Sequence, residues 1–367
     1  MAIISYPCKG KGGIKLTQKI LMKGSEAIAE AAILSGCRYF FGYPITPQNE
    51  IPEYLAKYLP KAGGTFLQAE SEISAIYMVL GAAAAGARVM TSSSSPGISL
   101  KQEGISYMAG AEAPCVIVNI MRGGPGLGAI QGAQPDYWQA TRGGGHGDYR
   151  LLVLAPATVQ EAVDLTYQAF DLADQYRNPV MVLGDGILAQ IMEPVSLPEA
   201  NKDLPEKPWA VGKQENRPRN IVSSSYPKVD ELEKVNIRLH ERYAQIKKNE
   251  VRWDSYLTDD AEYVIVAYGT AARIAKAAVK MARAEGIKAG LLRPVSVWPF
   301  PVEPFHKILG QAKFFLSFEM CTGQMIDDIR LAVGNERPVY HYGRLGGVIP
   351  LPEDLLAKIK ELVKEAK

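Results

Sequence analysis

The stretch PCVIVNIMRGG, residues 114–124, decides the fold class of this chain. Its apolar run is continuous rather than alternating, which is typical of a parallel strand that helices cover on both faces. The segment NPVMVLGDG, residues 178–186, has the same character. Around these two runs, short apolar segments alternate with helical patterns from about residue 23 to residue 186. This alternation predicts βαβ units, and hence an α/β domain with a parallel sheet.

The remaining sequence predicts a connector and a second domain. Pro- and Lys-rich segments fill residues 192–259 and include the amphipathic stretch ELEKVNIRLHERYAQIKK, which predicts one helix. From residue 261 the alternation of strands and helices resumes with EYVIVAYG. We therefore predict four parts, in chain order: an N-terminal extension (1–22), a first α/β domain (23–195), a connector with one helix (196–258) and a second α/β domain (259–367).

Composition narrows the class of protein. With 367 residues, 47% hydrophobic and 22% charged, and a net charge of +2, the chain has the make-up of a globular protein without a polyanion partner. No apolar run predicts a membrane span and no signal peptide is visible, so the cytoplasm is the expected location. The cysteines Cys8, Cys37, Cys115 and Cys321 form no CxxC pair. An iron–sulfur centre would therefore have to lie on another chain.

The segment GYPITPQNE, residues 42–50, follows a predicted strand and precedes a predicted helix. Parallel sheets bind ligands beyond the carboxyl ends of their strands, which is where Thr46 falls. A structural explanation is also available, since Pro44 and Pro47 shape a turn and Thr46 or Asn49 can cap the helix. On spacing alone, the structural explanation is favoured.

Glu72 lies at the start of a helix whose other residues, in SEISAIYMVLGAAAAG, are mostly small and apolar. A carboxyl group in that position would be partly desolvated and able to share a proton with a ring nitrogen. The helix dipole, which favours acidic residues in a first turn, explains Glu70 and Glu72 equally well. Without further information the dipole is the preferred explanation.

Two further segments leave the choice open. The hydroxyl-rich segment TSSSSPGISLKQEG, residues 91–104, offers backbone N–H groups and a helix N-terminus to a polar ligand, but a run of capping residues explains it equally well. His146, in GGGHGD, would be accessible between glycines. A hydrogen-bonded structural role accounts for this histidine equally well.

Arg122 ends the strand within residues 114–124 and precedes a glycine-rich loop. Its planar guanidinium matches a carboxylate in two-point geometry, although an ion pair with a nearby acid is the structural alternative. The loop also matches the dinucleotide fingerprint GxGxxA at residues 124–129. That fingerprint requires a strand-to-helix turn, whereas AIQGAQPDYW breaks any helix at once. We therefore interpret the glycines as an active-site loop.

Taken together, these motifs resemble the 2-oxoacid:ferredoxin oxidoreductase family, specifically the subunit with a pyrimidine-binding domain. The resemblance rests on YPITP at residues 43–47, on Ser71 and Glu72 before a Gly/Ala-rich helix, and on Arg122 fifty residues later. It covers nearly the whole chain. The implied α/β architecture is a thiamine-diphosphate-fold pyrimidine domain followed by a transketolase C-terminal-like domain, both with parallel or mostly parallel sheets.

The resemblance also implies roles for individual residues. Glu72 matches the family's catalytic glutamate, which contacts the aminopyrimidine of thiamine diphosphate, and Tyr43 and Pro44 belong to the same cofactor-binding region. Thr46 and Arg122 resemble the residues that hold the carbonyl and carboxylate of the 2-oxoacid. The implied reaction is oxidative decarboxylation to acyl-CoA and CO2, with coenzyme A as co-substrate and electrons passing to ferredoxin.

The family divides its cofactors among chains. The diphosphate and its Mg2+ belong to a partner subunit with a GDG…N segment, iron–sulfur clusters lie on partner subunits, and further small subunits are expected. Gly184–Gly186 spells GDG here, but no matching Asn motif follows, so no metal or diphosphate site is predicted on this chain. The active site would thus be shared between the chains of a hetero-oligomer.

The stretches at residues 43–55, 91–112 and 143–150 look most like the branched-chain type, whose substrate is 2-oxoisovalerate (3-methyl-2-oxobutanoate). Pyruvate and 2-oxoglutarate are alternatives, and 2-oxoglutarate requires a second cation, which Arg142 could supply. Two hypotheses from other classes stay open. One is a non-catalytic binding module that positions a partner enzyme, and the other is an NAD-dependent dehydrogenase built on the GxGxxA match.

Overall fold

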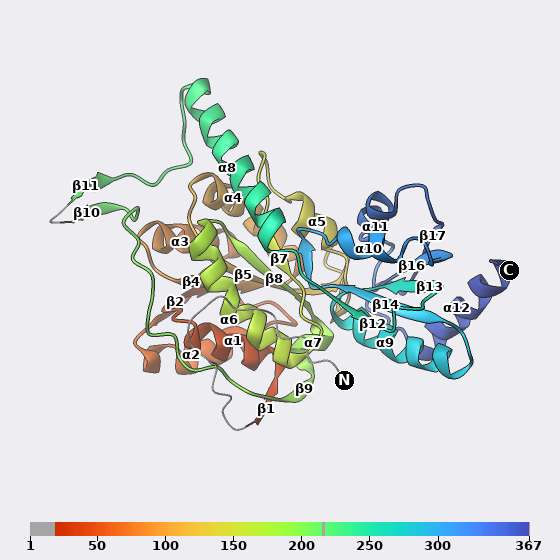
Figure 1. Ribbon diagram of the computed structural model, residues 1–367. Coiled ribbons are helices and arrows are strands. Elements are labelled where there is room, and N and C mark those ends of the chain that lie inside the picture. Colours follow the sequence, from red (N-terminus) through yellow and green to blue (C-terminus); the bar gives the residue numbers. More distant parts are fainter. Residues whose placement is uncertain (1–18, 215–216, 367) are drawn as a thin grey trace.

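The computed structural model describes residues 19–214 and 217–366, which form two α/β units side by side (Figure 1). The N-terminal unit, on the left, holds the larger sheet, and the C-terminal unit, on the right, holds the smaller one. Residues 1–18 of the predicted N-terminal extension lie outside the described residues. Strand β1 (Ile20–Lys23) begins just after them and pairs antiparallel with β9 (Met192–Val195).

The larger sheet has the strand order β15-β7-β8-β5-β4-β2-β3, and every neighbouring pair from β7 to β3 is parallel. The parallel strands are β2 (Tyr39–Gly42), β3 (Thr65–Gln68), β4 (Val89–Ser93), β5 (Val116–Gly123), β7 (Leu152–Leu154) and β8 (Val180–Asp185). β5 and β8 lie in the middle and are buried along their whole length. The two continuous apolar runs thus form the centre of the sheet.

Helices cover both faces of this sheet. One face carries α3 (Glu72–Ala84) and α4 (Ser95–Gly110), which pack against each other. The opposite face carries α1 (Gly24–Leu34), which contacts both α2 (Glu50–Tyr58) and α6 (Val159–Tyr176). The first turns of α3 and α4 therefore begin at the carboxyl edge of the sheet.

The smaller sheet has the order β12-β14-β13-β16-β17, in which β12 and β14 are antiparallel and the other pairs are parallel. Its strands are β12 (Trp253–Tyr256), β13 (Tyr263–Val266), β14 (Ala289–Pro294), β16 (Phe314–Glu319) and β17 (Val339–Gly343). Its helices are α9 (Gly269–Ala284), α10 (Glu303–Ile308), α11 (Ile326–Val333) and α12 (Pro352–Glu365). The prediction of two α/β units with mostly parallel sheets is confirmed.

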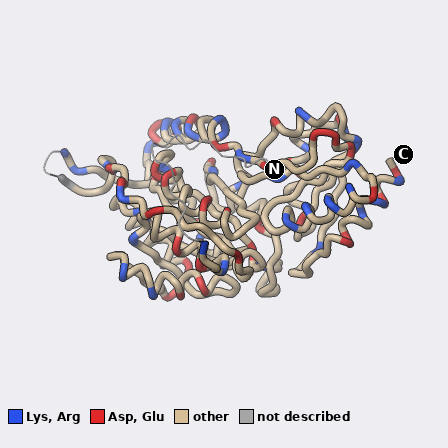
Figure 2. Tube along the Cα trace, turned by 60° about the horizontal axis from the view of Figure 1, so that its bottom comes forward, with Lys and Arg blue, Asp and Glu red and all other residues tan. Residues whose placement is uncertain are grey.

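The segment between the two sheets contains α8 (Val229–Asn249), where the amphipathic stretch lies. Figure 2 shows basic and acidic residues mixed along this helix. Glu112 forms ion pairs with Arg238 and Arg242, which hold the helix to the N-terminal unit. A short hairpin of β10 (Gly212–Gln214) and β11 (Arg217–Asn220) precedes the helix, and no sequence pattern predicts it.

The proposed division at residue 259 remains a prediction, and two strands cross it. β12 precedes this position but pairs with β14 of the smaller sheet. β15 (Ser296–Trp298), from the C-terminal half, pairs with β7 at the edge of the larger sheet. The backbone N–H of Ala155 also donates to the carbonyl oxygen of Val295 at 2.8 Å. The two units therefore share main-chain hydrogen bonds.

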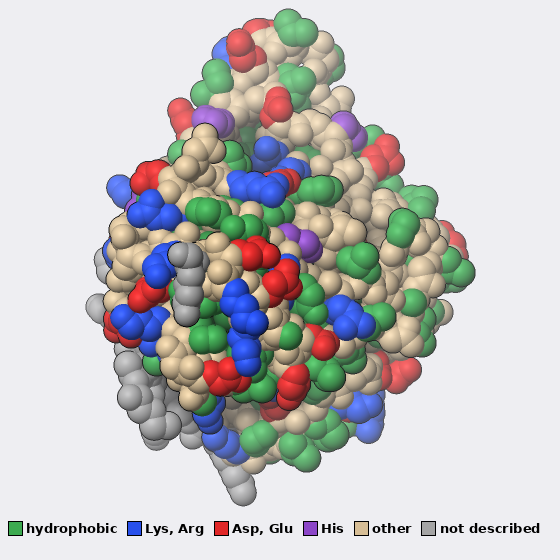
Figure 3. All heavy atoms as spheres, turned by 90° about the vertical axis from the view of Figure 1, so that its right-hand side faces the viewer, with side chains coloured by type: hydrophobic (Ala, Val, Ile, Leu, Met, Phe, Trp, Pro, Cys, Tyr) green, Lys and Arg blue, Asp and Glu red, His purple; other side chains and the backbone are tan. Residues whose placement is uncertain are grey.

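Figure 3 views the side of the molecule formed by the C-terminal unit, where acidic, basic and apolar side chains are interspersed. In residues 19–214 and 217–366, no helix has the length and apolar character that a bilayer crossing requires. The same residues contain no group of His, Cys, Asp and Glu side chains arranged to hold a metal ion. Cys37, Cys115 and Cys321 are free and buried, whereas Cys8 lies outside the described residues.

Candidate active site

Four adjacent strands of the larger sheet deliver polar residues to one edge. β5, β4, β2 and β3 are parallel neighbours, so their carboxyl ends meet, which is where such sheets bind ligands. Thr46 follows β2, Glu72 follows β3, Ser93 ends β4 and Arg122 lies near the end of β5. The fold thus places the predicted site residues at a common edge.

Arg122 is only 5% exposed and reaches the loop that follows β2. Its Nη1 donates to the carbonyl oxygen of Thr46 at 2.9 Å, and its Nη2 donates to the carbonyl oxygen of Leu127 at 2.9 Å. These partners are carbonyl groups rather than the acid that the structural alternative requires. A guanidinium has five N–H groups, so two carbonyls orient Arg122 and leave N–H groups for an anion.

The loop at residues 43–47 is anchored by Gln48, which is fully buried. Gln48 Nε2 donates to the carbonyl oxygen of Tyr43 at 3.3 Å, and its Oε1 accepts from Ser92 Oγ at 2.5 Å. Asn49 is the N-cap residue of α2 but makes no capping hydrogen bond with its side chain. Helix capping therefore does not explain the polar residues of this loop, which is tied instead to β4.

Glu72 is the first residue of α3 and is only 6% exposed. Ser71 caps the helix, since its Oγ accepts from the backbone N–H of Ser74 at 3.2 Å. The Glu72 carboxylate lies against α4 at Gly97. A Cβ added to Gly97 would lie 2.7 Å from Glu72 Oε1 and 2.1 Å from Ser93 Oγ. Glycine at this position therefore lets the helix backbone approach the carboxylate.

Other predicted residues at this edge differ in their exposure. Glu70 is exposed and accepts a hydrogen bond from Ser74 Oγ, whereas Glu72 is buried. The helix dipole favours an acidic residue at either position, so it does not explain this difference in exposure. Tyr43 is half-buried and Pro44 is exposed, both directly after β2. Their predicted contact with a cofactor stays a prediction.

Lys101 is a residue of this region that the sequence analysis did not single out. It is fully buried on α4, and its Nζ donates to Thr91 Oγ1 at 2.6 Å and to the carbonyl oxygen of Ser92 at 3.0 Å. Burial lowers the pKa of Lys101 to about 7, and the charge of Glu72 acts in the opposite direction. The signal in the sequence is its position four residues after Gly97, which places both on one face of the helix.

Several polar atoms at this edge are buried. Within the part of the chain that the structure describes, Ser93 Oγ, Ser94 Oγ and Arg122 Nε are buried and make no hydrogen bond. Buried polar groups are normally satisfied by protein, water or a ligand. An aminopyrimidine ring offers both hydrogen-bond donors and acceptors. Together with the buried carboxylate of Glu72, these atoms therefore fit the cofactor that the family resemblance implies.

The glycine-rich loop after Arg122 forms a hairpin turn. β5 ends at Gly123, and β6 (Ala129–Gly132) returns antiparallel to it. Gly126 and Gly128 have φ angles of 67° and 60°, in the left-handed region that glycine adopts at least cost. A dinucleotide fingerprint needs a helix after the strand, so the NAD hypothesis loses its structural basis.

A cleft of about 680 Å³ separates this hairpin from part of the C-terminal unit. Asp136 and Ser95 line it on one side and Cys321 on the other. Asp136 Oδ2 accepts from Ser95 Oγ at 2.7 Å and from Asn119 Nδ2 at 2.9 Å. Burial raises the pKa of Asp136, and the hydrogen bonds and the charge of Arg122 offset only part of this effect.

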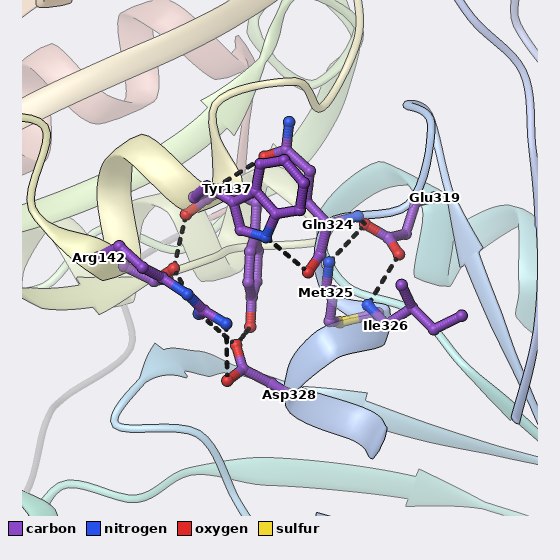
Figure 4. Close-up of polar contacts among 9 residues, drawn as sticks. Tyr137, Arg142, Glu319, Gln324, Met325, Ile326 and Asp328 are labelled. Carbon is purple, nitrogen blue, oxygen red and sulfur yellow. Dashed lines mark hydrogen bonds and ion pairs between the residues drawn. The ribbon is translucent and has the colours of Figure 1, made fainter. Parts of the chain in front are cut away.

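Arg142 belongs to a polar cluster between the two units (Figure 4). Its guanidinium donates to both carboxylate oxygens of Asp328, at 2.7 and 3.2 Å, and Tyr137 Oη donates to the same carboxylate at 2.5 Å. Glu319 accepts hydrogen bonds from backbone N–H groups at the start of α11, which fixes the helix that carries Asp328. Arg142 is thus engaged with α11.

Two other candidates have structural partners. Asp185, in the GDG segment, is the N-cap of α7 (Gly186–Gln190), where its Oδ1 accepts from two backbone N–H groups at 2.9 and 3.1 Å and from Thr270 Oγ1 at 2.9 Å. His146 is exposed, and its ring packs edge-on against Tyr107 with centroids 5.9 Å apart. Asp185 ends β8, which pairs with β5, so it lies at the same edge of the sheet, but its Oδ1 is engaged by the helix cap and by Thr270.

Family models match both units. A model described as pyruvate flavodoxin/ferredoxin oxidoreductase, thiamine diphosphate-binding, matches residues 30–253, and pyruvate:ferredoxin oxidoreductase core domain II matches residues 261–355. Ketoisovalerate oxidoreductase subunit VorB of Methanothermobacter thermautotrophicus is 52% identical over 94% of this chain and 98% of its own length. The 2-oxoglutarate synthase subunit KorA of that organism is 36% identical over 95% of this chain and 100% of its own.

Solved structures agree with these matches. The 2-oxoglutarate:ferredoxin oxidoreductase from Magnetococcus marinus, solved with 2-oxoglutarate, coenzyme A and succinyl-CoA bound, superposes with a TM-score of 0.85 at 28% identity, over 96% of this chain and 66% of that one. A split-gene transketolase, solved as an inactive β4 tetramer, has a TM-score of 0.60 at 14% identity, over 94% of this chain and 99% of that one, and shares the fold alone. The chain belongs to the 2-oxoacid:ferredoxin oxidoreductase family.

Proposed function

We propose that this chain is the subunit of a thiamine-diphosphate-dependent 2-oxoisovalerate:ferredoxin oxidoreductase that binds the cofactor's aminopyrimidine and the substrate's carboxylate. The reaction is oxidative decarboxylation to acyl-CoA and CO2, with electrons passing to ferredoxin. One observation carries the proposal: a buried, preoriented Arg122 shares a sheet edge with the buried carboxylate of Glu72. The 52% identity to VorB supports the choice of substrate.

Arg122 and Thr46 hold the 2-oxoacid in this proposal. The carbonyl contacts of Arg122 fix the plane of its guanidinium, and its Nε, which makes no hydrogen bond within the described part of the chain, is available to a carboxylate oxygen. A guanidinium fork recognises a carboxylate by two parallel hydrogen bonds, which sets the orientation of the bond to be broken. Thr46 is tied to this arginine through its main-chain carbonyl, and we assign its hydroxyl, which accepts from Asn49 Nδ2 at 3.5 Å, to the substrate carbonyl.

Glu72, Ser93 and Ser94 receive the aminopyrimidine, with Tyr43 and Pro44 beside them. When bound, thiamine diphosphate supplies the electron sink that decarboxylation of a 2-oxoacid requires. The Glu72 carboxylate holds or shares the proton of a ring nitrogen, and its burial shields that hydrogen bond from water. The serine hydroxyls, which lack partners within the described residues, complete the polar contacts of the ring.

The rest of the active site belongs to other chains in this proposal. A partner subunit binds the diphosphate with its Mg2+, and partner subunits carry the iron–sulfur clusters and pass electrons to ferredoxin. Asp185 Oδ1 accepts hydrogen bonds from the start of α7 and from Thr270. This structural role agrees with a diphosphate site on a partner subunit. Coenzyme A acts as co-substrate, and the proposed location of the complex is the cytoplasm.

A branched-chain substrate is favoured over 2-oxoglutarate by the surroundings of Thr46. A cavity of about 650 Å³ beside this residue is lined by Ile130 and Ile187, and the charged residues of its described lining are acidic, Glu50 among them. An apolar substituent fits such a lining better than a second carboxylate does. Arg142, the cation considered for that carboxylate, is paired with Asp328 instead (Figure 4).

The complex purified with its partner subunits tests the proposed function directly. Reduction of methyl viologen is measured with 2-oxoisovalerate, pyruvate and 2-oxoglutarate, each with and without coenzyme A. We expect dye reduction that requires coenzyme A, with kcat/KM for 2-oxoisovalerate at least about 10-fold above the other two acids. Preference for 2-oxoglutarate would contradict the substrate, and absence of dye reduction with every acid would contradict the reaction.

One pair of variants distinguishes this proposal from the hypothesis of a non-catalytic binding module. Glu72→Gln keeps the volume and hydrogen-bonding capacity but removes the charge, and it should lower kcat by at least about 100-fold. Glu70→Gln, at the exposed neighbouring acid, should leave kcat unchanged. If Glu72→Gln retains full turnover in the assembled complex, this chain only positions its partner.

A further inference from the structure

Lys101 is a buried lysine that forms no ion pair with any of the described residues. Its side chain is fully buried, and its Nζ donates to a hydroxyl, Thr91 Oγ1, and to a carbonyl oxygen, that of Ser92. Thr91 Oγ1 in turn donates to the carbonyl oxygen of Phe41 at 2.7 Å, so the ammonium group is locked between β4 and β2. Burying a charge costs solvation free energy unless the charge is paired or hydrogen-bonded.

Glu72 is the acidic residue whose charge acts on Lys101. Gly97 and Lys101 are four residues apart on α4 and lie on the same face of the helix, which at Gly97 touches the Glu72 carboxylate. Helical side chains lean toward the N-terminus, so the lysine stem runs back over the turn that contains Gly97. The second ionisable group facing Lys101 is the thiol of Cys115, whose pKa is raised by burial, so it stays neutral.

We propose that Lys101 is a positioning residue for Glu72: its ammonium group, fixed by Thr91 and Ser92, holds the Glu72 carboxylate in one orientation. The inference rests on the function proposed above, in which Glu72 faces the aminopyrimidine. It adds a buried electrostatic partner for the carboxylate, supplied by the helix of the neighbouring βα unit in the same chain.

The charge of Lys101 depends on pH near neutrality. Burial lowers the pKa of Lys101 to about 7, and the charge of Glu72 acts in the opposite direction. Deprotonation of Lys101 removes the cation that Thr91 and Ser92 fix in place. The effect of Lys101 on the Glu72 carboxylate should therefore weaken as the pH rises through this range.

The test is Lys101→Met in the assembled complex, because methionine keeps the length of the side chain and removes the charge. The acid limb of the pH profile of kcat/KM should move to higher pH by at least about 1 unit, since the carboxylate loses its cation. The near-ultraviolet circular dichroism of the cofactor-loaded complex, which reports the protonation of the aminopyrimidine, should change its pH dependence in the same direction.

A second readout needs no cofactor. Lys101 has a lower pKa in the folded state than its usual 10.5, so between pH 7 and 10.5 the unfolded state binds a proton that the folded state lacks. Stability therefore rises with pH in this window. The melting temperature of the cofactor-free wild-type complex should rise relative to that of Lys101→Met as the pH increases from 7 to 9.

Three further variants distinguish a failure of this inference from a failure of the proposed function. Lys57→Met, at an exposed lysine, should leave every readout unchanged. Thr91→Val keeps the Lys101 charge but removes one anchor, so its pH profile should move in the same direction by a smaller amount, and it serves if Lys101→Met does not assemble. If Glu72→Gln abolishes turnover while Lys101→Met and Thr91→Val both keep the wild-type pH profile, this inference fails. Full turnover of Glu72→Gln would overturn the proposed function instead.

Discussion

Arg122 Nη1 donates to the carbonyl oxygen of Thr46 at 2.9 Å, although 76 residues separate the two in the sequence. The contact ties the end of β5 to the loop after β2, across the intervening strand β4. Because a second carbonyl, that of Leu127, binds the other terminal nitrogen, the guanidinium is held before any substrate arrives. Such preorganisation lowers the entropy that is lost when a substrate is bound.

Arg122→Lys should lower kcat/KM for the 2-oxoacid by about 10-fold to 100-fold, mainly through KM. A lysine ammonium cannot hold two carbonyls and a carboxylate in fixed planar geometry. Steady-state kinetics of the assembled complex measure the effect. The matched control is Arg38→Lys, since Arg38 also donates to backbone carbonyls but precedes β2, at the opposite edge of the sheet. Equal losses in both variants would argue against a substrate role for Arg122.

Gly97→Ala should lower kcat by about 100-fold, because the added Cβ must displace either the Glu72 carboxylate or Ser93 Oγ. The comparison is Gly81→Ala on α3, where a Cβ meets nothing within 4 Å. That variant should keep kcat and increase the free energy of unfolding by up to about 1 kcal/mol, as alanine favours the helix. An active Gly97→Ala complex would show that close approach of α4 to Glu72 is dispensable.

Arg142→Met should leave the ratio of kcat/KM between 2-oxoisovalerate and 2-oxoglutarate unchanged, because the guanidinium is paired with Asp328. Its effect should appear in stability, where a partly exposed ion pair contributes up to about 1 kcal/mol. Competition between the two acids and thermal unfolding measure the two effects separately. A selective loss of 2-oxoglutarate turnover would restore Arg142 as a substrate-binding cation.

Asp136→Asn should stabilise the cofactor-free complex more at neutral pH than at acidic pH. Burial raises the pKa of Asp136 above its usual 3.8, so the folded state keeps a proton that the unfolded state has already lost as the pH rises. Stability therefore falls through that window, and the asparagine variant escapes the loss. Melting temperatures of both forms between about pH 4 and pH 7 check this, and a constant difference would contradict it.

The larger sheet and its ligand-binding edge could be predicted from the sequence, because both follow from local patterns. The mostly apolar runs at residues 116–121 and 180–184 are typical of parallel strands buried on both faces. Arg122 lies near the end of one of these strands and Thr46 follows the strand predicted at CRYFF, and parallel strands bring their carboxyl ends together. The family resemblance supplies what local patterns leave open, which is the choice of Glu72 over the helix-dipole explanation.

The features that could not be predicted from the sequence depend on contacts between segments that are distant along the chain. Lys101 sits in a helix that continues as QEG and has the appearance of a solvated residue, yet it is fully buried and donates to Thr91 and Ser92 of β4. Gln48 looks like an ordinary first-turn residue, and its burial depends on Ser92 from another strand. Arg142 was considered as a substrate cation because Asp328, 186 residues later, cannot be paired with it from sequence alone.

The pairing of β15 with β7 restricts how a substrate can enter. Because a strand from the C-terminal half hydrogen-bonds along the edge of the larger sheet, the two units cannot swing apart like the halves of a hinge without breaking main-chain bonds. The roughly 680 Å³ cleft between them therefore has walls whose relative position is fixed by main-chain bonds. A ligand that enters this cleft meets a spacing that the folded chain has already set, rather than one that domain opening creates.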